Sequence, residues 1–331
     1  MNSNFWAELN QPIIALAPMF NVTDVAFREM FARYGQPDVM FTEFVSCNGL
    51  QSPGRDKLLV DFKFTQKQRP IVAQIWGEKV ENYRQTAELC AELGFDGIDI
   101  NMGCPDKAVL KQGACGALID QPDLAKKIIR ETMRGAGKLP VSVKTRLGVR
   151  RNEIEDWTKH ILETQPAALI VHGRTCKEMS KVPARWDEIA KARQVRDQLG
   201  GKTLVLGNGD VRDLVDAKSK AAEYKLDGVM IGRGAFGNPW AFNPKRPAET
   251  LTLEEKLEAL VEHTVLFDKW LSRHKSFMLM RKHFSSYISG YPNTKALKME
   301  LMETQNAKEV ARIIKKFLKN SPGAKTLTPM P

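Results

Sequence analysis

The chain has 331 residues, of which 43% are hydrophobic, and it contains no apolar run long enough to span a bilayer. This length accommodates a barrel of about 250 residues followed by a small second domain. Residues 241–331 carry 16 basic and 9 acidic side chains, so +7 of the net charge of +11 falls there. This bias favours a polyanion as partner of the C-terminal part, and a merely soluble basic surface is the alternative.

The five cysteines are widely spaced and include no Cys-x-x-Cys pair. An odd, scattered set argues against a disulfide framework and against an iron–sulfur site, and it is typical of a reducing cytosol. Residues 1–6 have no basic segment before an apolar core, so we expect no signal peptide. We therefore expect a cytoplasmic protein that has no metal site and does not bind membranes.

Eight short apolar runs recur along the first part of the chain, with amphipathic helix patterns such as 81–93 and 123–133 between them. Nearly continuous apolar runs are typical of strands that are buried on both faces. A doubly wound sheet gives the same alternation of strand and helix, but a count of eight favours a (β/α)8 TIM barrel. The predicted strands are 13–17, 39–43, 71–75, 97–100, 141–145, 168–172, 203–206 and 228–231.

Candidate binding residues follow the first predicted strand and interrupt the third. Pro18, Met19 and Phe20 follow the first strand, where core filling is the alternative role for the last two. Thr23-Asp24 then predicts the cap of a helix. Gln74 interrupts the apolar third strand, and a buried amide requires hydrogen-bond partners.

Asn101-Met102-Gly103-Cys104-Pro105 leaves the fourth strand. Pro105 cannot donate to a strand ladder and biases Cys104 to an extended backbone, which places a thiol at the strand exit. Catalytic groups lie at such exits in parallel barrels. A small buried hydrophobe is the alternative role for any cysteine, and the neighbouring Asn, Gly and Pro make that role less fitting here.

Two charged side chains interrupt the fifth strand. Lys144 and Arg146 are two residues apart and therefore lie on the same face of the strand. A lysine inside a barrel is costly unless it contacts an anion or a ligand, so we favour a ligand, with an ion pair to Asp99 as the alternative. His172 ends the sixth strand on the rim that carries Lys144 and Cys104, so we expect it to line the same pocket.

Glycine-rich segments follow the seventh and eighth strands, at 207–210 and 232–234. In barrels these two loops commonly bind phosphate through backbone N–H groups and a helix N-terminus. Glycine permits the close approach of the phosphate, and Arg233 adds a positive charge. The pair of loops therefore predicts a phosphorylated cofactor.

The character of the chain changes after residue 240. Residues 244–247 form an expected linker, 252–255 predict a helix cap, and helical patterns at 257–270, 276–288 and 307–318 follow. We therefore predict a barrel domain over 1–245, a helical domain over 250–320 and a disordered tail over 321–331. Interleaved basic and aromatic residues suit RNA, although the aromatic rings could be the core of the helical domain. These residues are Lys269, Arg273, His274, Lys275, Phe277, Arg281, Lys282, Phe284, Tyr287 and Tyr291.

Taken together, these motifs resemble the dihydrouridine synthases, flavin enzymes that reduce uridines in folded RNA, chiefly tRNA. The resemblance covers nearly the whole chain, and its motifs fall in the order of the family. One departure is Cys115, at a position where many relatives, though not all, have a smaller residue. The matching motifs are Gln74, Asn101-Met102-Gly103-Cys104-Pro105, the segment 111–118, Lys144-Thr145-Arg146, His172-Gly173-Arg174-Thr175, Asn208-Gly209-Asp210 and Gly232-Arg233.

The resemblance implies an FMN cofactor, NADPH as its reductant, and tRNA or rRNA as substrate. Reduced FMN would give hydride to C6 of a uracil that is turned out of the RNA, and Cys104 would protonate C5. Asn101, Arg146 and Arg174 would bind the substrate. The residues expected to bind FMN are Pro18, Met19, Phe20, Gln74, Lys144, His172, Asn208, Gly209, Asp210, Gly232 and Arg233.

Two other functions are kept as alternatives. A free-pyrimidine flavin dehydrogenase of the dihydroorotate type would share the barrel, FMN and a loop cysteine, but it would not need a basic helical appendage. A non-catalytic RNA-binding protein on a barrel frame would hold no flavin. For any of these functions the sequence indicates no obligate protein partner, and we expect a monomer.

Overall fold

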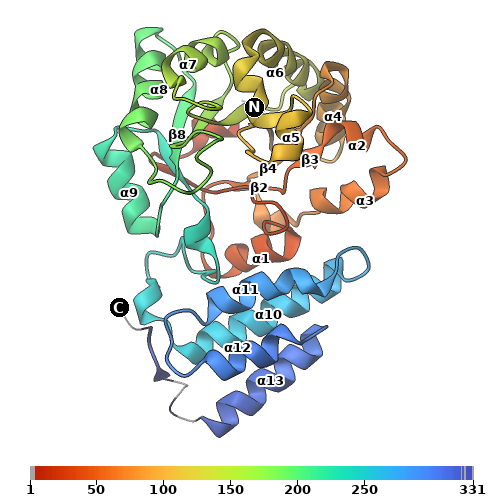
Figure 1. The fold of residues 1–331 in the computed structure, drawn as a ribbon, viewed down its shortest axis with the longest axis vertical. Helices are drawn as coiled ribbons and strands as arrows, with labels where there is room; N and C mark the ends of the chain where they lie inside the picture. Colours follow the sequence, from red (N-terminus) through yellow and green to blue (C-terminus); the bar gives the residue numbers. More distant parts are fainter. Residues whose placement is uncertain (1–3, 322, 324–325, 330–331) are drawn as a thin grey trace.

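The computed structural model describes residues 4–321, 323 and 326–329 (Figure 1). One parallel sheet runs in the order β1, β9, β8, β7, β6, β5, β4, β2, and a parallel bridge between Ala15 and Val39 joins its first and last strands. The predicted (β/α)8 barrel is therefore confirmed, and an open doubly wound sheet is excluded. The strands are β1 (Ile13–Leu16), β2 (Met40–Phe41), β3 (Val45–Ser46), β4 (Ile71–Trp76), β5 (Gly97–Met102), β6 (Val141–Arg146), β7 (Ala168–His172), β8 (Leu204–Asn208) and β9 (Gly228–Ile231).

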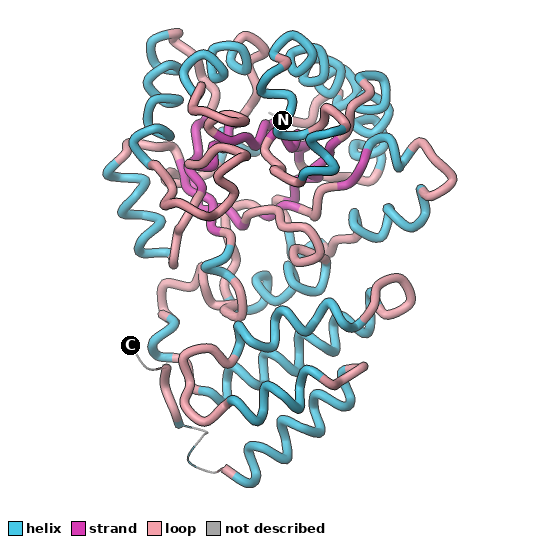
Figure 2. The backbone as a smooth tube through the Cα atoms, viewed as in Figure 1, coloured by secondary structure: helices cyan, strands magenta, loops and turns pink. Residues whose placement is uncertain are grey.

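Helices surround the strands on the outside of the barrel, as Figure 2 shows in cyan around magenta. The predicted cap of the first helix is confirmed, since the Asp24 carboxylate accepts a hydrogen bond from the N–H of Phe27 (2.9 Å). The α-helices of this part are α1 (Val25–Tyr34), α2 (Cys47–Leu50), α3 (Arg55–Leu59), α4 (Val80–Glu92), α5 (Lys107–Lys111), α6 (Pro122–Ala136), α7 (Ile154–Leu162), α8 (Trp186–Gln198) and α9 (Leu214–Glu223). The 3-10 helices of the chain are η1 (Phe5–Glu8), η2 (Val60–Phe62), η3 (Gln66–Gln68), η4 (Cys115–Asp120), η5 (Arg233–Ala235), η6 (Ala248–Thr250) and η7 (Phe277–Met280).

Strand residues alternate between two apolar clusters. Ile14 and Leu16 of β1 face the helices, whereas Ile13 and Ala15 face the inside of the barrel. The inner cluster fills the amino end of the barrel, and Trp6 of η1 packs into it with 2% of its surface exposed. The interior is thus closed at one end, so a cavity can form only at the other.

A four-helix bundle follows the barrel and packs beside α1 (Figure 1). The predicted cap of its first helix is confirmed, because Thr252 and Glu255 form a reciprocal capping box. Phe277, Phe284 and Tyr287 are buried in the core of the bundle, as is Tyr291, so of the two roles considered for these rings the core role is the one that they take. The bundle helices are α10 (Leu253–Leu271), α11 (Arg281–Tyr287), α12 (Lys295–Met302) and α13 (Ala307–Asn320).

The last segment, 321–331, was predicted to be a disordered tail. Residues 322, 324–325 and 330–331 lie outside the described part of the chain. Within the described part, the carbonyl of Leu327 accepts a hydrogen bond from the N–H of Leu253 (2.8 Å) at the start of α10. Of the helices described, none is both long and apolar enough to cross a bilayer.

Candidate active site

A cavity of about 380 Å³ opens at the carboxyl ends of the barrel strands. Each of the eight strands in the barrel ring, or the loop that follows it, contributes to the lining, because parallel strands end at the same edge of the sheet. Every site residue predicted from the sequence except Phe20 lines this cavity. They are Pro18, Met19, Gln74, Asn101, Cys104, Lys144, Arg146, His172, Arg174, Asn208, Gly209, Asp210, Gly232 and Arg233.

The loop that carries Cys104 is held by the side chain of Asn101. Asn101 Oδ1 accepts hydrogen bonds from the backbone N–H groups of Gly103 (3.1 Å) and Cys104 (3.0 Å). Its Nδ2 donates to Oε1 of Gln74 on β4 (3.2 Å). Asn101 therefore fixes the backbone of the loop, and its second N–H stays available to a ligand.

The Cys104 thiol is partly exposed and accepts a hydrogen bond from the thiol of Cys115. This bond lowers the pKa of Cys104 to about 7, while burial opposes the shift and the Arg146 guanidinium supports it. Cys115 begins η4 and is fully buried, and burial raises the pKa of its thiol well above the ordinary value. Because a proton donor works best with a pKa near the working pH, Cys104 is suited to general acid catalysis.

A buried carboxylate, Asp99 on β5, organises the amide of Gln74. Asp99 accepts hydrogen bonds from Nε2 of Gln74 (2.7 Å) and from Oγ of Ser142 (2.6 Å). Burial raises the pKa of Asp99 to about 6, and the two hydrogen bonds oppose that shift. The amide of Gln74 thus has partners inside the barrel, and one of its N–H groups is left for a ligand.

The half-buried ammonium of Lys144 donates a hydrogen bond to Oδ1 of Asn208 (3.1 Å), and Nδ2 of Asn208 donates to the carbonyl of Met230 (2.8 Å). Burial, together with the nearby charge of Arg146, lowers the pKa of Lys144 to about 8. The alternative of an ion pair with Asp99 is wrong, because that carboxylate bonds to Gln74 and Ser142 instead. Lys144 keeps two N–H groups that can meet an anionic ligand.

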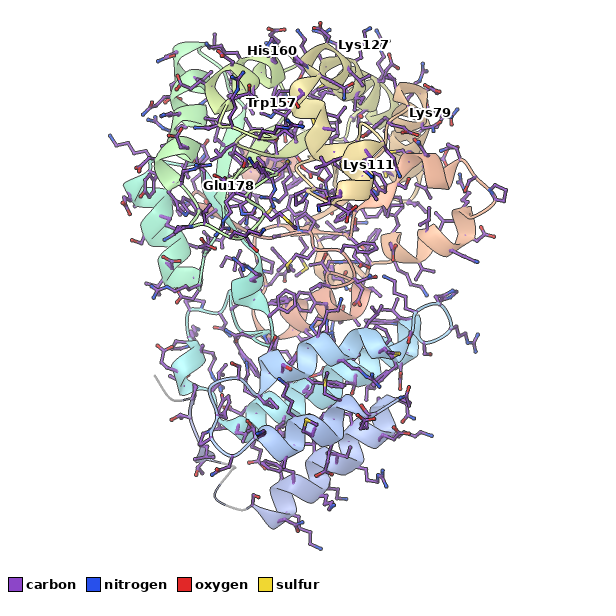
Figure 3. The ribbon with its side chains drawn as sticks, in the orientation of Figure 1. Lys79, Lys111, Lys127, Trp157, His160 and Glu178 are labelled. Carbon is purple, nitrogen blue, oxygen red and sulfur yellow. The ribbon has the colours of Figure 1, made fainter. Side chains whose placement is uncertain are left out.

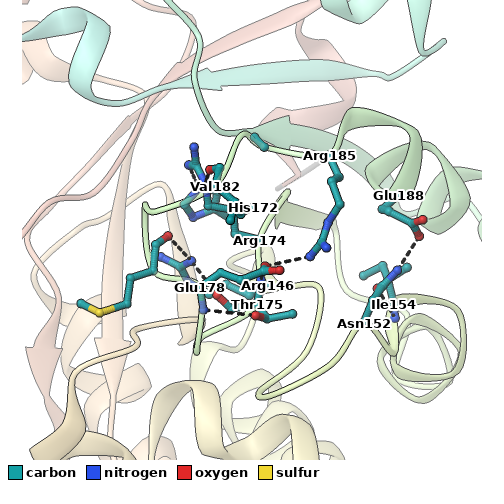
Figure 4. Close-up of polar contacts among 12 residues, drawn as sticks. Arg146, Asn152, Ile154, His172, Arg174, Thr175, Glu178, Val182, Arg185 and Glu188 are labelled. Atoms are coloured by element: carbon teal, nitrogen blue, oxygen red, sulfur yellow. Dashed lines mark hydrogen bonds and ion pairs between the residues drawn. The ribbon is translucent and has the colours of Figure 1, made fainter.

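Arg146 ties the Cys104 loop to the loop after β7, and Figure 4 shows its contact with Thr175 of the second loop. Its Nε donates to the carbonyl of Gly103 (2.7 Å), and its Nη1 donates to the carbonyls of Thr175 (3.2 Å) and Met179 (3.1 Å). Nη2 has no partner among the described residues. The side chain therefore positions two loops and still offers two N–H groups to the cavity.

Arg174 is 3% exposed and bonds to the carboxylate of Asp210 and the carbonyl of Val182. It also donates to Nε2 of His172 (3.1 Å). Arginine only donates, so Nε2 accepts, and neutral His172 carries its proton on Nδ1. His172 stays neutral because burial, together with four surrounding cations, lowers its pKa well below the ordinary value.

The loops after β8 and β9 present backbone N–H groups that have no hydrogen-bond partner among the described residues. They include the N–H groups of Gly209, Asp210 and Arg233. Gly209 has a φ of +126°, and a Cβ there would lie 2.7 Å from Cβ of Ala184. The guanidinium of Arg233 stands at the mouth, bound to Asp210 (2.8 Å). Unpaired N–H groups beside a cation suit a phosphate, as the sequence predicts.

The family model for dihydrouridine synthase matches residues 15–321 of this chain. The chain belongs to the dihydrouridine synthase family. It is 42% identical over 320 residues to the "Probable tRNA-dihydrouridine synthase" of Staphylococcus aureus (strain MRSA252), and the match covers 96% of each chain. It is 41% identical to the "Probable tRNA-dihydrouridine synthase 2" of Bacillus subtilis (strain 168), over 96% of this chain and 97% of that one.

Among solved structures, histamine dehydrogenase from Rhizobium sp. 4-9 matches with a TM-score of 0.52 and 12% identity. The match covers 76% of this chain and 48% of that chain, and at this identity it establishes a shared fold alone. The family membership, by contrast, rests on sequence along nearly the whole length of the chain, as the motifs predict.

Several residues that line the cavity were not predicted from the sequence, and one residue that was predicted, Phe20, lies outside it. Phe44, Met179, Ser180 and Val211 line the cavity without having been predicted. Phe44 directly follows the second predicted strand, so its position at a strand exit was the available signal. Phe20 is 59% exposed, and its ring lies against that of Phe44 with 5.5 Å between the centroids.

Proposed function

We propose that this protein reduces uridine to 5,6-dihydrouridine in RNA, with tRNA as substrate, FMN as cofactor and NADPH as reductant. The proposal rests on one observation, that the partly exposed thiol of Cys104 and the half-buried ammonium of Lys144 line one cavity. Membership of the family and the names of its relatives support this reaction over the dehydrogenation of a free pyrimidine and over a non-catalytic role.

The donors that line the cavity fit a phosphorylated flavin. The unpaired N–H groups of Gly209 and Arg233 suit its phosphate, and Lys144 supplies a positive charge for a ring system that becomes anionic on reduction. When bound and reduced by NADPH, FMN supplies the hydride that reaches C6 of the uracil. The rest of the proposed binding surface is formed by Pro18, Met19, Gln74, His172, Asn208, Asp210 and Gly232.

Cys104 carries the proton step. Its thiol donates a proton to C5 of the uracil, so that C5 and C6 each gain a hydrogen and the double bond between them is saturated. The thiolate that remains is stabilised by the S–H of Cys115 and by the charge of Arg146. Solvent then returns a proton to Sγ, which a pKa of about 7 permits at neutral pH.

The substrate uracil is held by groups that keep unused donors. Asn101 and Arg146 each retain N–H groups beyond those that fix the loops, and these suit the uracil carbonyls. Arg174 was predicted to bind the substrate directly. Since each of its nitrogens already has a partner, we assign it the positioning of the loop after β7.

The bundle is proposed to bind RNA through its exposed cations. Lys269, Arg273 and Lys282 are exposed and suit backbone phosphates. Lys275 is removed from this set, because it forms ion pairs with Glu43 and Asp61 of the barrel. A cytoplasmic location and a monomeric state remain predictions of the sequence.

The proposed function is tested by supplying the purified protein with NADPH and an unmodified tRNA transcript. We expect each reduced uridine to add about two mass units to one nucleotide, as measured by mass spectrometry of nuclease digests. The same assay with free uridine and with dihydroorotate tests the dehydrogenase alternative. Turnover of a free pyrimidine without turnover of tRNA would refute the proposal.

A further inference from the structure

A second depression, of about 620 Å³, adjoins the cavity and takes no part in the reaction as described. Its lining includes apolar Leu110 and Val149 and one carboxylate, Asp120. Pro105 and Met179 border both hollows, so the two share a rim. We call this hollow the basic depression, after the four cations in its lining, which are Lys107, Lys111, Arg150 and Lys177.

The four cations of the basic depression are not paired with any carboxylate of the described chain. All are exposed, and none forms an ion pair or a side-chain hydrogen bond within the part of the chain that the structure describes. Lys107 and Lys111 lie four residues apart on one face of α5, where like charges repel each other (Figure 3 labels Lys111). This arrangement weakens the helix slightly, and an anion from outside the chain would relieve it.

The wall that carries Arg150 and Lys177 is fixed by backbone hydrogen bonds. The N–H of Lys177 donates to the carbonyl of Val149 (2.9 Å), which joins the loop after β7 to the loop after β6. A second bond runs from the N–H of Cys176 to the carbonyl of Gly148 (2.9 Å). The cations therefore extend from a preformed surface, which lowers the entropy that a ligand must overcome.

The position of the depression in the barrel suggests which anion it receives. In the ring of strands, β6 lies across the barrel from β1, and β7 lies across from β2. The bundle contacts the side of β1 and β2, where Lys275 pairs with Glu43 and the exposed Lys282 donates to the carbonyl of Asn21 (2.8 Å). The basic depression lies on the side of the loops after β6 and β7, so exposed cations lie on both sides of the cavity.

We propose that the basic depression binds the nucleotide next to the target uridine, with its base on the apolar floor and its phosphate among the cations. This inference rests on the proposed function. A uridine that enters the cavity stays linked to its neighbours, whose phosphates must lie at the rim. An apolar surface beside cations is the combination that a single-stranded nucleotide requires. NADPH has similar chemistry, but a strand that passes through the site needs charge on both sides, as here.

The test compares two variants with the same change of charge. Lys111→Glu/Lys177→Glu alters the basic depression on two separate segments. Lys138→Glu/Lys202→Glu alters exposed lysines in loops that precede β6 and β8, at the opposite end of the barrel. For the first variant we expect about tenfold weaker binding of tRNA. The slope of log affinity against log salt concentration should be smaller by about two, since about two phosphate contacts are lost. Binding by the second should stay within about twofold of the wild type.

The rate at saturating tRNA and the reduction of the bound flavin by NADPH should be unchanged in both variants. Equal losses in the two variants, or unchanged tRNA affinity in the first, would overturn the proposal. A raised KM for NADPH with unchanged tRNA affinity would assign the depression to the reductant instead. Failure of the proposed function is distinguishable, because the wild-type protein itself would then form no dihydrouridine.

Discussion

The two ends of the barrel are built from the same strands and differ in what they bury. At the amino end, Trp6 packs with Ile13 and Phe41 in an apolar cluster. At the carboxyl end, half-buried Lys144 and buried Arg146 line a cavity. Apolar burial stabilises a fold by about 25 cal/mol per Å², whereas a buried charge costs free energy unless it is paired. The comparison indicates that stability comes from one end and chemistry from the other.

The largest expected effect is the loss of turnover in Cys104→Ala. The substitution removes the proton donor, and general acid catalysis contributes about 10²–10⁴-fold to a rate. The midpoint of thermal unfolding should change little, because the thiol lies partly exposed in the cavity. Steady-state formation of dihydrouridine and a thermal melt measure the two quantities.

Cys90→Ala is the matched control for that loss. Cys90 is fully buried against the outside of the barrel on α4, so its removal should lower the free energy of unfolding by about 1 kcal/mol and leave turnover intact. Retained turnover in Cys104→Ala would place the proton donor elsewhere, with Cys115 as the nearest candidate.

Trp6→Ala should have the opposite effect to Cys104→Ala, a loss of stability without a loss of turnover. Trp6 is 2% exposed and its rings contact Phe5 and Phe41, so its loss should lower the free energy of unfolding by about 3–5 kcal/mol. Turnover per folded molecule should be unchanged at low temperature, because the cavity lies at the other end of the barrel. Chemical denaturation and active-site titration test this, and a lower kcat at full folding would contradict the separation of the two ends.

The interface between the barrel and the bundle differs from both ends of the barrel, because it buries a cluster of charged side chains that does not line the cavity. Lys275 of the bundle pairs with Glu43, which is 1% exposed, and with Asp61 (2.6 Å). Burial raises the pKa of Glu43 to about 7, and Lys275 opposes this shift. Lys275→Met removes that opposition, so the folded-state pKa of Glu43 should rise further above its ordinary value of 4.5.

A raised folded-state pKa makes the stability of this variant fall as pH rises. The loss should be small near pH 4.5, should grow as pH passes 7, and should reach about 1.4 kcal/mol relative to the wild type at pH 8. Urea unfolding at several pH values measures it. Lys282→Met, at an exposed cation whose ammonium contacts the carbonyl of Asn21, is the control and should lose less than about 1 kcal/mol at any pH. A loss independent of pH would show that Glu43 does not titrate in this range.

The barrel and its mouth were predictable because both follow from local pattern. Each strand is a short apolar run, and parallel strands end at one edge, so a polar residue at any strand exit points to the same cavity. This reasoning brought together Cys104, Lys144 and His172, although they lie far apart in sequence.

Pairings between distant residues were not predictable. Lys275 and Glu43 are 232 residues apart, and nothing in either local segment identifies the other. For the same reason the sequence left two roles open for the aromatic residues of the bundle, RNA binding and core packing, and Phe284 and Tyr287 take the second. Amphipathic spacing shows that a helix has two faces, but it does not say which aromatic residues the core will take.

The smallest expected effect concerns the acidity of Cys104 and tests its assignment most directly. Cys115→Ala removes the thiol that donates to Sγ of Cys104, so the pKa of Cys104 should rise from about 7 toward its ordinary value of 9.0. The alkaline limb of the pH–turnover profile, where the acid loses its proton, should move up by about one pH unit. At pH 7 the rate should change only a few-fold, because a larger protonated fraction offsets a weaker acid.

Cys176→Ala is the control for Cys115→Ala, since it removes a neighbouring buried thiol that does not bond to Cys104. The alkaline limb of the pH–turnover profile of Cys176→Ala should not move, even if the variant is somewhat less stable. An unmoved limb in Cys115→Ala would mean that the titrating acid is not Cys104, and the chemistry assigned to the carboxyl end of the barrel would then need another donor.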